Sequence, residues 1–295
     1  MKTVVVRNPL GYYELAHKPS QAELKAYYAE KYYQNAEGSY EISYSEAEKE
    51  YFRNKISQKL IVANRHLRLT PDRPPRFLDV GAGEGWSLAY FSSRGWHCTG
   101  LDYSSFGCTA QNSQVEASLK IGDIYDNTQA LIVADERFEL ILLDNVLEHV
   151  LDPLDLLMQL RLLLARGGVL LVEVPNDYSA LQQHLLAHGH IDHPFWVAAP
   201  DHISYFGPDG LTAIAGAAGW QVKELMTDYP IDLCLMNAST NYVRDRSLGK
   251  ACHKARVETE NLLHSISPEK TVALYQALAS LGLGRALTAV LVADE

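Results

Sequence analysis

Short apolar runs alternate with segments of helical pattern between Phe77 and Lys223. This alternation indicates parallel strands joined by helical crossovers, because a parallel strand can begin only after the chain has returned to the same edge of the sheet. The predicted strands are residues 76–80, 97–102, 117–121, 138–143, 168–174 and 220–226. The crossover helix at 153–165 is expected to end at 166–168, where a cation precedes two glycines. The pattern therefore predicts an α/β fold.

The segments on either side of this region have different patterns. Residues 1–70 lack the alternation and are expected to form a helical N-terminal cap, with capping-box spacing at Ser20 with Glu23 and at Ser45 with Glu48. The remaining divisions are residues 71–229 as the core, 230–284 as a helical insertion or lid, and 285–295 as a final core strand. The last helix of the insertion is expected to open at 267–269. We expect the cap and the insertion to lie over the carboxyl ends of the strands and close a pocket.

Composition and charge narrow the range of partners. The 295 residues include 26 Lys plus Arg and 36 Asp plus Glu, so the formal net charge is −10. Nucleic acid is disfavoured as a partner because its binding depends on basic side chains that neutralise phosphates. The four cysteines have no metal-site or disulfide spacing, and charges interrupt every apolar stretch before about 18 residues. We expect a cytoplasmic monomer or homodimer that binds a small molecule and neither nucleic acid nor membrane.

The most specific sequence feature is RFLDVGAGEGW at 76–86, in which an apolar strand leads into three closely spaced glycines. A dinucleotide-binding fold usually has the spacing G-x-G-x-x-G, but position 86 is Trp86, which disfavours an NAD-dependent oxidoreductase. The spacing D-x-G-x-G-x-G resembles the first motif of class I S-adenosylmethionine-dependent methyltransferases. By this resemblance, the cofactor-binding residues of the segment are Asp79, Gly81, Ala82, Gly83 and Gly85.

The next two strand ends continue the resemblance. Asp102 closes the second strand, followed by Tyr103, and an acid at this place can accept both ribose hydroxyls of the cofactor. Asp123 and Ile124 follow the third strand, where the family has an acid at the adenine amino group and an apolar residue against the ring. Three such elements at successive strand ends are a far more specific signal than the glycines alone.

The fourth strand, FELILLDNVLEHVLDP at 138–153, resembles that of the ubiquinone-pathway O-methyltransferases. It carries Asp144 and Asn145 to the ligand edge, beneath the methionine part of the cofactor in the family. On a helical turn, Asn145, Glu148 and His149 would share one face. A Glu-x-x-Glu-His set in those relatives can hold a divalent metal, but Asn145 stands where that set has its first glutamate. The sequence therefore assigns no metal-binding residue and leaves metal use open.

The acceptor side offers several candidate residues. An alcohol acceptor benefits from a general base, for which the candidates are His149, His202 and His193, although each could instead only hold its loop. Trp196 and Tyr205 are consistent with either an acceptor-pocket wall or the core. Candidate substrate-binding residues also include Arg244 and Arg246, from a basic stretch that suits an anionic acceptor or a solvated helix face.

The resemblance implies a Rossmann-like methyltransferase sheet of seven strands, six parallel and the last antiparallel. The expected activity is methyl transfer from S-adenosylmethionine to a small polar acceptor, which could be anionic. The preferred acceptor atom is an oxygen of a sugar or of a secondary-metabolite intermediate. N-methylation of an amino sugar or other amine stays open, because no residue separates the two acceptors. A methyltransferase-like binding protein without turnover is the alternative from another class.

Overall fold

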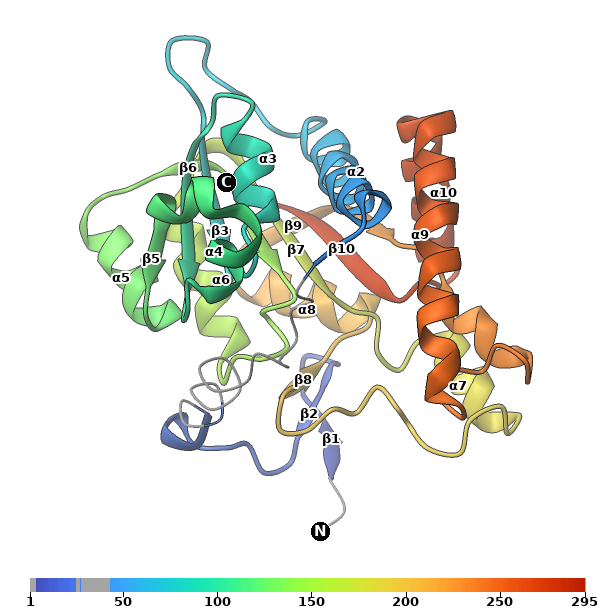
Figure 1. The fold of residues 1–295 in the computed structure, drawn as a ribbon. Helices are drawn as coiled ribbons and strands as arrows, with labels where there is room; N and C mark the ends of the chain where they lie inside the picture. Colours follow the sequence, from blue (N-terminus) through green and yellow to red (C-terminus); the bar gives the residue numbers. More distant parts are fainter. Residues whose placement is uncertain (1–3, 25–26, 28–42, 295) are drawn as a thin grey trace.

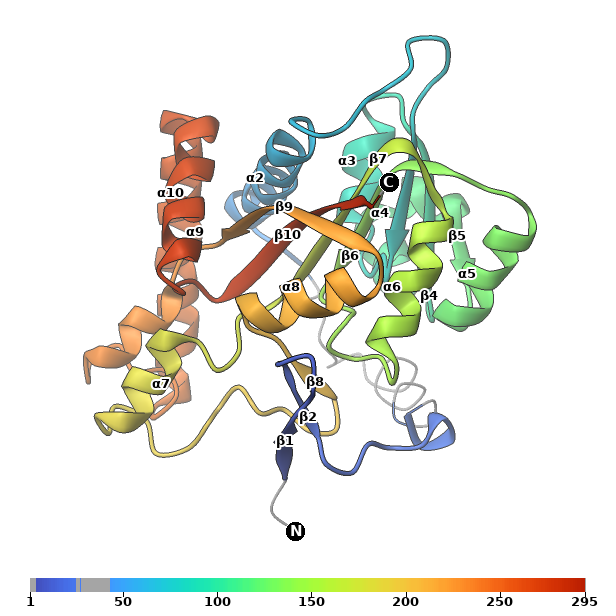
Figure 2. The same ribbon diagram turned by 180° about the vertical axis from the view of Figure 1, so that it is seen from behind.

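A seven-stranded sheet forms the centre of the molecule (Figures 1 and 2). The computed structural model describes residues 4–24, 27 and 43–294. The strands are β3 (Arg76–Val80), β4 (His97–Asp102), β5 (Leu119–Ile121), β6 (Phe138–Asp144), β7 (Leu164–Pro175), β9 (Trp220–Thr227) and β10 (Ala286–Ala293). Their order is β5-β4-β3-β6-β7-β10-β9, and β10 runs antiparallel to both of its neighbours while the first five strands pair in parallel. The predicted sheet of six parallel strands and an antiparallel last strand is confirmed.

Helices cover both faces of the sheet, which explains why the central strands are continuously apolar. One face holds α5 (Ile124–Val133), α6 (Pro153–Leu162) and α8 (Pro208–Ala217). The other holds α2 (Glu46–Ala63), α3 (Trp86–Ser92), α4 (Phe106–Asn112) and α10 (Pro268–Ser280). Successive strand residues alternate between the faces, so Leu78 packs with the first group and Phe77 with the second.

The N-terminal region is not wholly helical as predicted. Strands β1 (Val5–Arg7) and β2 (Tyr13–Leu15) form a hairpin, and β2 also pairs with β8 (Ser204–Tyr205). A tight turn makes the hairpin: the Asn8 side chain accepts the Leu10 N–H at 2.9 Å, and Gly11 has a φ of 90°. The two predicted capping boxes do form, and the second one starts α2. Part of the predicted cap, residues 28–42, lies outside the described residues.

The predicted insertion is mostly helical, but its last helix packs on a face of the sheet rather than over the strand ends. It contains η2 (Ile231–Met236), η3 (Arg246–Leu248), α9 (Gly249–Ile266) and α10, which is capped by Ser267 as predicted. Val272 and Tyr275 of α10 are buried in the apolar cluster on one face of the sheet. The side chain of Asn261 on α9 accepts a hydrogen bond from Asn54 of α2 at 3.0 Å. Helix α10 thus packs against the sheet, and α9 packs against α2.

Two boundaries differ from the sequence prediction. Helix α6 ends at Leu162, and residues 166–168 already belong to β7. The pairing of β6 with β7 shifts register between Phe138 and Leu140, which accommodates the glycines within the strand. Before β5, the first two residues predicted as strand, 117 and 118, belong to the 3₁₀ helix η1 (Ser113–Ser118). Helix α7 (Ala180–Ala187) follows β7.

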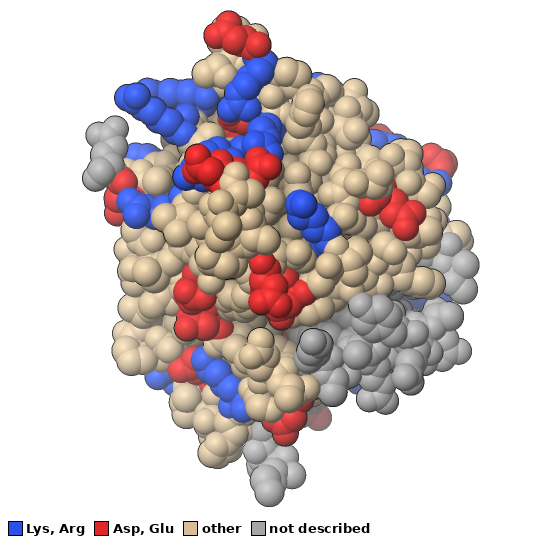
Figure 3. Space-filling view, turned by 90° about the vertical axis from the view of Figure 1, so that its left-hand side faces the viewer, with Lys and Arg blue, Asp and Glu red and all other residues tan. Residues whose placement is uncertain are grey.

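On the face shown in Figure 3, acidic and basic side chains are interspersed, with wide uncharged areas between them. No helix within residues 4–24, 27 and 43–294 is both long enough and apolar enough to span a membrane.

Candidate cofactor and acceptor site

A cavity of about 330 Å³ lies at the carboxyl ends of β3, β4, β5 and β6. This edge is where ligands bind in open α/β sheets. The predicted site residues among its lining are Gly81, Gly83, Asp102, Tyr103, Asp123, Ile124, Asp144, Asn145 and His149. The fold therefore brings residues from four successive strand ends, spread over about 70 positions of the sequence, into one hollow.

The glycines after β3 are required by backbone geometry. Gly81 has a φ of 80°, and a Cβ placed on it would lie 2.3 Å from Cγ2 of Val146. Gly83 has a φ of 53°, a region that residues with a side chain rarely adopt. Gly85 precedes α3 with a φ of 75°. The loop can thus bend tightly and present backbone to a ligand at close range.

Asp102 forms the next wall of the cavity and holds the glycine loop. Its carboxylate accepts the backbone N–H of Gly83 at 2.8 Å and that of Ser104 at 3.0 Å. Burial raises the pKa of Asp102, while these backbone hydrogen bonds act in the opposite direction. Two carboxylate oxygens have about four acceptor positions, so hydroxyl donors of a ligand can still bind.

Asp123 and Tyr103 form a hydrogen-bonded pair beside Asp102. The Tyr103 hydroxyl donates to Oδ2 of Asp123 at 2.7 Å. The other oxygen, Oδ1, caps α5 by accepting the N–H of Tyr125 at 2.9 Å and that of Asp126 at 3.3 Å. Asp123 thus has a structural role in addition to its place in the cavity, and the orientation of its carboxylate is fixed.

Asp144 and Asn145 end β6 at the other side of the glycine loop. The Asn145 amide donates to Oδ1 of Asp144 at 2.8 Å, and Lys59 of α2 pairs with Oδ2. Asn145 has a φ of 53°, and its N–H donates to the carbonyl oxygen of Glu173 at 2.9 Å. Both oxygens of Asp144 are therefore held by neighbouring donors.

Three predicted cofactor-binding residues are buried and do not line the cavity, namely Asp79, Ala82 and Gly85. Burial, together with the charge of Asp144, raises the pKa of Asp79 to about 8. Asp79 is thus a protonated acid near neutral pH rather than a charged ligand-binding group.

His149 is the one predicted catalytic histidine that lines the cavity. Its Nδ1 lies 2.7 Å from the carbonyl oxygen of Asp201, and its Nε2 lies 3.8 Å from Oε1 of Glu148. The ring of His202 stands edge-on at a centroid distance of 4.8 Å. His202 thus supports His149 from outside the cavity lining.

Glu148, His149 and His202 could together hold a metal ion, since one donor atom from each lies within 4.8 Å of the others. Glu148 is 1% exposed, its carboxylate has no hydrogen-bond partner outside its own residue in the described chain, and burial raises its pKa well above the usual range. The predicted helical face of Asn145, Glu148 and His149 is wrong. Residues 147–149 form a turn, and the left-handed backbone at Asn145 directs its amide to Asp144.

The remaining predicted histidine and aromatic residues lie elsewhere. His193 has a side chain that is 62% exposed and pairs with Asp192, so its position does not support a catalytic role. Trp196 is buried in an apolar cluster that includes Leu185. Tyr205 is fully buried in β8, and its hydroxyl donates to the carbonyl oxygen of His202 at 2.9 Å. These aromatic residues are core residues in this structure.

The two predicted arginines also lie outside the cavity lining. The guanidinium of Arg244 donates to the carbonyl oxygen of Gly189, and Arg246 is an exposed residue at the start of η3. Lys254, farther along the same basic stretch, lies 3.8 Å from Glu258 at the surface. These contacts match a solvated basic face rather than an anion-binding lid.

Sequence reasoning missed six lining residues, which are Gln21, Leu24, Tyr125, Val146, Val150 and Leu151. Tyr125, Val146 and Val150 are close in sequence to predicted site residues, so strand-end position could have identified them. Gln21 and Leu24 come from the N-terminal segment, which was expected to close the pocket as a whole, but no local pattern singles out these two residues.

Comparison with known proteins identifies the fold family. The model of a methyltransferase domain family matches residues 52–225, more than half of the chain. A ubiquinone biosynthesis O-methyltransferase of Dinoroseobacter shibae is 32% identical over 107 residues, which are 36% of this chain and 43% of that protein. The enzyme of the same name from Parvibaculum lavamentivorans is 30% identical over 138 residues, which are 46% of this chain and 53% of that protein.

The matched region spans about half the length of these curated relatives. Among solved structures, a SAM dependent methyltransferase from Archaeoglobus fulgidus has a TM-score of 0.49 at 16% identity, covering 84% of this chain and 99% of that one. This chain belongs to the class I S-adenosylmethionine-dependent methyltransferases, because it matches the family model and has the strand order and the glycine-rich loop of that family.

Proposed function

We propose that this protein transfers a methyl group from S-adenosylmethionine to an oxygen of a small polar acceptor. The observation that carries the proposal is that one cavity is lined both by His149 and by the strand-end residues that resemble the cofactor motifs. When bound, S-adenosylmethionine supplies an electrophilic methyl group on a sulfonium. The reaction needs chiefly a positioned nucleophile and a place for its proton, both of which a cavity of this kind can provide.

The residues present fit the cofactor. Asp102 has acceptor capacity for ribose hydroxyls, and Asp123 with Ile124 offers an acid and an apolar side chain for the adenine. Asp144, paired with Lys59 and Asn145, is the carboxylate for the cationic amino-acid end. The loop at Gly81 lies between these two ends, where a Cβ would collide with Val146.

His149 is the proposed proton acceptor. A carbonyl oxygen can only accept, so the contact with Asp201 requires Nδ1 to carry a hydrogen. In the neutral ring the lone pair is then on Nε2, which takes the proton from the acceptor hydroxyl.

The acceptor is proposed to be a hydroxyl-bearing sugar or secondary-metabolite intermediate. Oxygen is favoured over nitrogen by the O-methyltransferase relatives and by a histidine in the cavity, because an alcohol benefits from a base. An anionic group on the acceptor is no longer supported, because Arg244 and Arg246 lie outside the cavity lining.

A second cavity of about 530 Å³ offers room for the body of the acceptor. Leu24 lines both cavities, and Lys18 in the second donates to the carbonyl oxygen of Leu151 in the first at 3.4 Å. Ala199 and Pro200 also line the second cavity, directly before Asp201. The body of the acceptor would thus lie next to His149.

The test is methyl transfer from S-adenosylmethionine labelled in the methyl group to a panel of phenols, sugars, nucleotide sugars and amines, with mass detection of the products. The proposal expects a labelled methyl ether from at least one hydroxyl compound. Product only from amines would overturn the oxygen assignment. Binding of cofactor without any product, together with capture of a defined partner enzyme, would favour the binding-protein alternative.

A further inference from the structure

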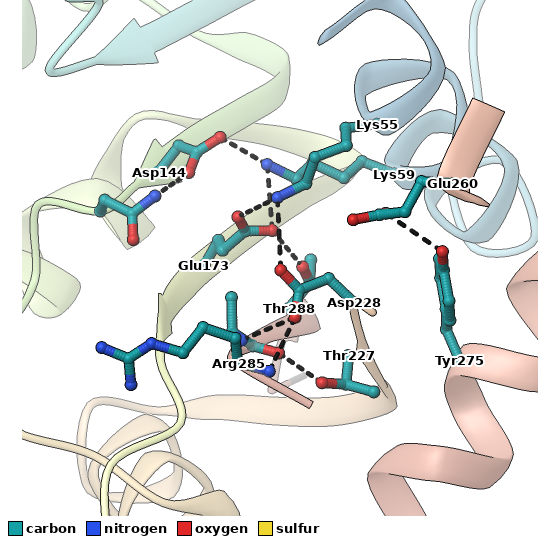
Figure 4. A network of polar contacts seen from close by, with 12 residues as sticks. Lys55, Lys59, Asp144, Glu173, Thr227, Asp228, Glu260, Tyr275, Arg285 and Thr288 are labelled. Atoms are coloured by element: carbon teal, nitrogen blue, oxygen red, sulfur yellow. Dashed lines mark hydrogen bonds and ion pairs between the residues drawn. The ribbon is translucent and has the colours of Figure 1, made fainter. Parts of the chain in front are cut away.

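A buried lysine outside the cavity lining contacts the acid at the cavity's edge. Lys59 of α2 pairs with Oδ2 of Asp144, and its Nζ lies 3.1 Å from Oε2 of Glu173 on β7 (Figure 4). Only 4% of the Lys59 side chain is exposed. Lysines are rarely buried to this extent unless carboxylates compensate for lost hydration. Lys59 therefore joins helix α2 to the site.

The contacts continue away from the cavity through alternating charges. Lys55, one helical turn before Lys59, has its Nζ 3.2 Å from Glu173 and 3.8 Å from Asp228. Asp228 pairs with Arg256 of α9, and Nε of Arg256 lies 2.8 Å from Glu260. The whole network lies between the helical layer and the sheet, and only its Asp144 end lines the cavity.

At the cavity end of this network, Lys59 supplies the positive charge that compensates the carboxylate of Asp144. Burial opposes its charge, but Asp144 and Glu173 outweigh this effect and raise the pKa of Lys59. Asp144 and Glu173 contact the same ammonium, so without it the partly exposed Asp144 carboxylate would face the buried Glu173 carboxylate with no cation between them. Asp144 would also lose the donor that holds its Oδ2.

We infer that Lys59 is a positioning residue of the cofactor site, which holds the Asp144 carboxylate toward the cavity for the cationic amino-acid end of the cofactor. The inference rests on the proposed assignment of this cavity to S-adenosylmethionine. Lys59 does not line the cavity among the described residues, so it acts through Asp144. Asn145 fixes the other oxygen of the same carboxylate at 2.8 Å, which leaves one orientation.

A double-mutant cycle on cofactor binding tests this inference. Calorimetric titration with S-adenosylhomocysteine is made on the wild type, Lys59→Met, Asp144→Asn and the double variant. Lys59→Met should weaken binding about tenfold in the wild-type background but less than about twofold when Asp144→Asn is present, because the two residues act as one unit. Equal fold losses in both backgrounds would overturn the inference.

A truncated ligand separates positioning from general damage. 5′-Methylthioadenosine has the adenosine part but lacks the amino-acid end. Lys59→Met should leave its dissociation constant within about twofold of the wild type, while a merely structural role would weaken both ligands alike. If Lys59→Met does not fold, Lys59→Gln is titrated with the same two ligands. Unchanged affinity of Lys59→Gln for both ligands would contradict the inference.

Two further variants serve as controls. Glu173→Gln removes a carboxylate that pairs with Lys55 and Lys59, so this variant should unfold at a lower temperature. It leaves the contact between Lys59 and Asp144 in place, so it should bind S-adenosylhomocysteine within about twofold of the wild type. Lys49→Met removes a surface pair with Glu46 on the same helix and should change neither property. Failure of the wild type to bind S-adenosylhomocysteine would refute the proposed function, whereas wild-type affinity in a folded Lys59→Met would refute only this inference.

Discussion

Nδ1 of His149 lies 2.7 Å from the carbonyl oxygen of Asp201, a contact that fixes which ring nitrogen carries a hydrogen. Asp201 belongs to the loop that precedes β8, and β8 pairs with the N-terminal hairpin through β2. A hydrogen bond to one ring nitrogen of a histidine fixes both the orientation of the ring and its tautomer. The small three-stranded sheet thereby takes part in building the acceptor side.

Replacing His149 by Asn should lower kcat for a hydroxyl acceptor by about 10²- to 10⁴-fold, the usual contribution of a positioned general base. The S-adenosylhomocysteine dissociation constant should change by less than about threefold, since this residue faces the acceptor. The matched control is His193→Asn, an exposed histidine outside the cavity lining, for which kcat should not change. A large kcat loss in both variants, or in neither, would remove His149 as the proton acceptor.

Alanine substitutions at Gly81 and Gly95 separate the effect of backbone strain from the effect of close packing against a neighbouring side chain. Both have a φ of 80°, but a Cβ on Gly95 would meet nothing within 4 Å, whereas one on Gly81 would meet Val146. Gly95→Ala should cost about 1–2 kcal/mol in unfolding free energy because of its left-handed backbone. Gly81→Ala should cost about 1–3 kcal/mol more, because its Cβ also collides with Val146. Only Gly81→Ala should also weaken S-adenosylhomocysteine binding, by more than about tenfold. Calorimetry beside urea unfolding measures both effects, and equal behaviour of the two variants would contradict the role of close approach.

Asp79 should make the protein less stable as pH rises. Its pKa is raised to about 8, mainly by burial, whereas an unfolded chain releases this proton near pH 4. Between these values the folded state holds a proton that the unfolded state has lost, so this group's contribution to the unfolding free energy decreases with rising pH. Asp79→Asn should thus gain at least about 1 kcal/mol relative to the wild type between pH 5 and pH 8. Urea unfolding measures both free energies at each pH. If the difference between Asp79→Asn and the wild type is the same at pH 5 and at pH 8, Asp79 does not titrate in this way.

A chelator should leave methyl transfer unchanged, because the proposed mechanism gives the proton to His149 without a metal. EDTA-treated and Mg²⁺- or Zn²⁺-supplemented protein are compared in the same transfer assay. Loss of activity with EDTA, restored by one of the ions, would instead assign Glu148, His149 and His202 to a metal site.

The strand ends of the core could be predicted because their signals are local. An apolar run that stops at Gly81 or Asp102 shows both the strand and its ligand edge in a few residues. The β1–β2 hairpin was missed because its strands have three residues each and β2 pairs with β8, which lies far along the chain. Short strands of this kind have too few residues to establish a period.

Long-range polar contacts were equally invisible to sequence patterns. Lys55 and Lys59 have the spacing of one helix face, which in isolation suggests an exposed face. Lys59 is buried and Lys55 is 19% exposed, and these positions depend on Glu173 and Asp144 from distant strands. The turn at Asn145 was misjudged for a related reason, since its positive φ accompanies a bond from its N–H to Glu173 of the neighbouring strand. Oligomeric state, cellular location and the acceptor stay predictions.

The most direct test of the account is calorimetric titration of the wild type and Asp102→Ala with S-adenosylhomocysteine and with NAD. The account predicts micromolar binding of S-adenosylhomocysteine to the wild type, no binding of NAD, and a loss of about 5- to 100-fold in Asp102→Ala because ribose hydroxyls lose their acceptor. Asp126→Ala, an exposed acid on α5, is the control and should bind as the wild type does. Binding of NAD instead, or unchanged affinity in Asp102→Ala, would contradict the assignment of this cavity.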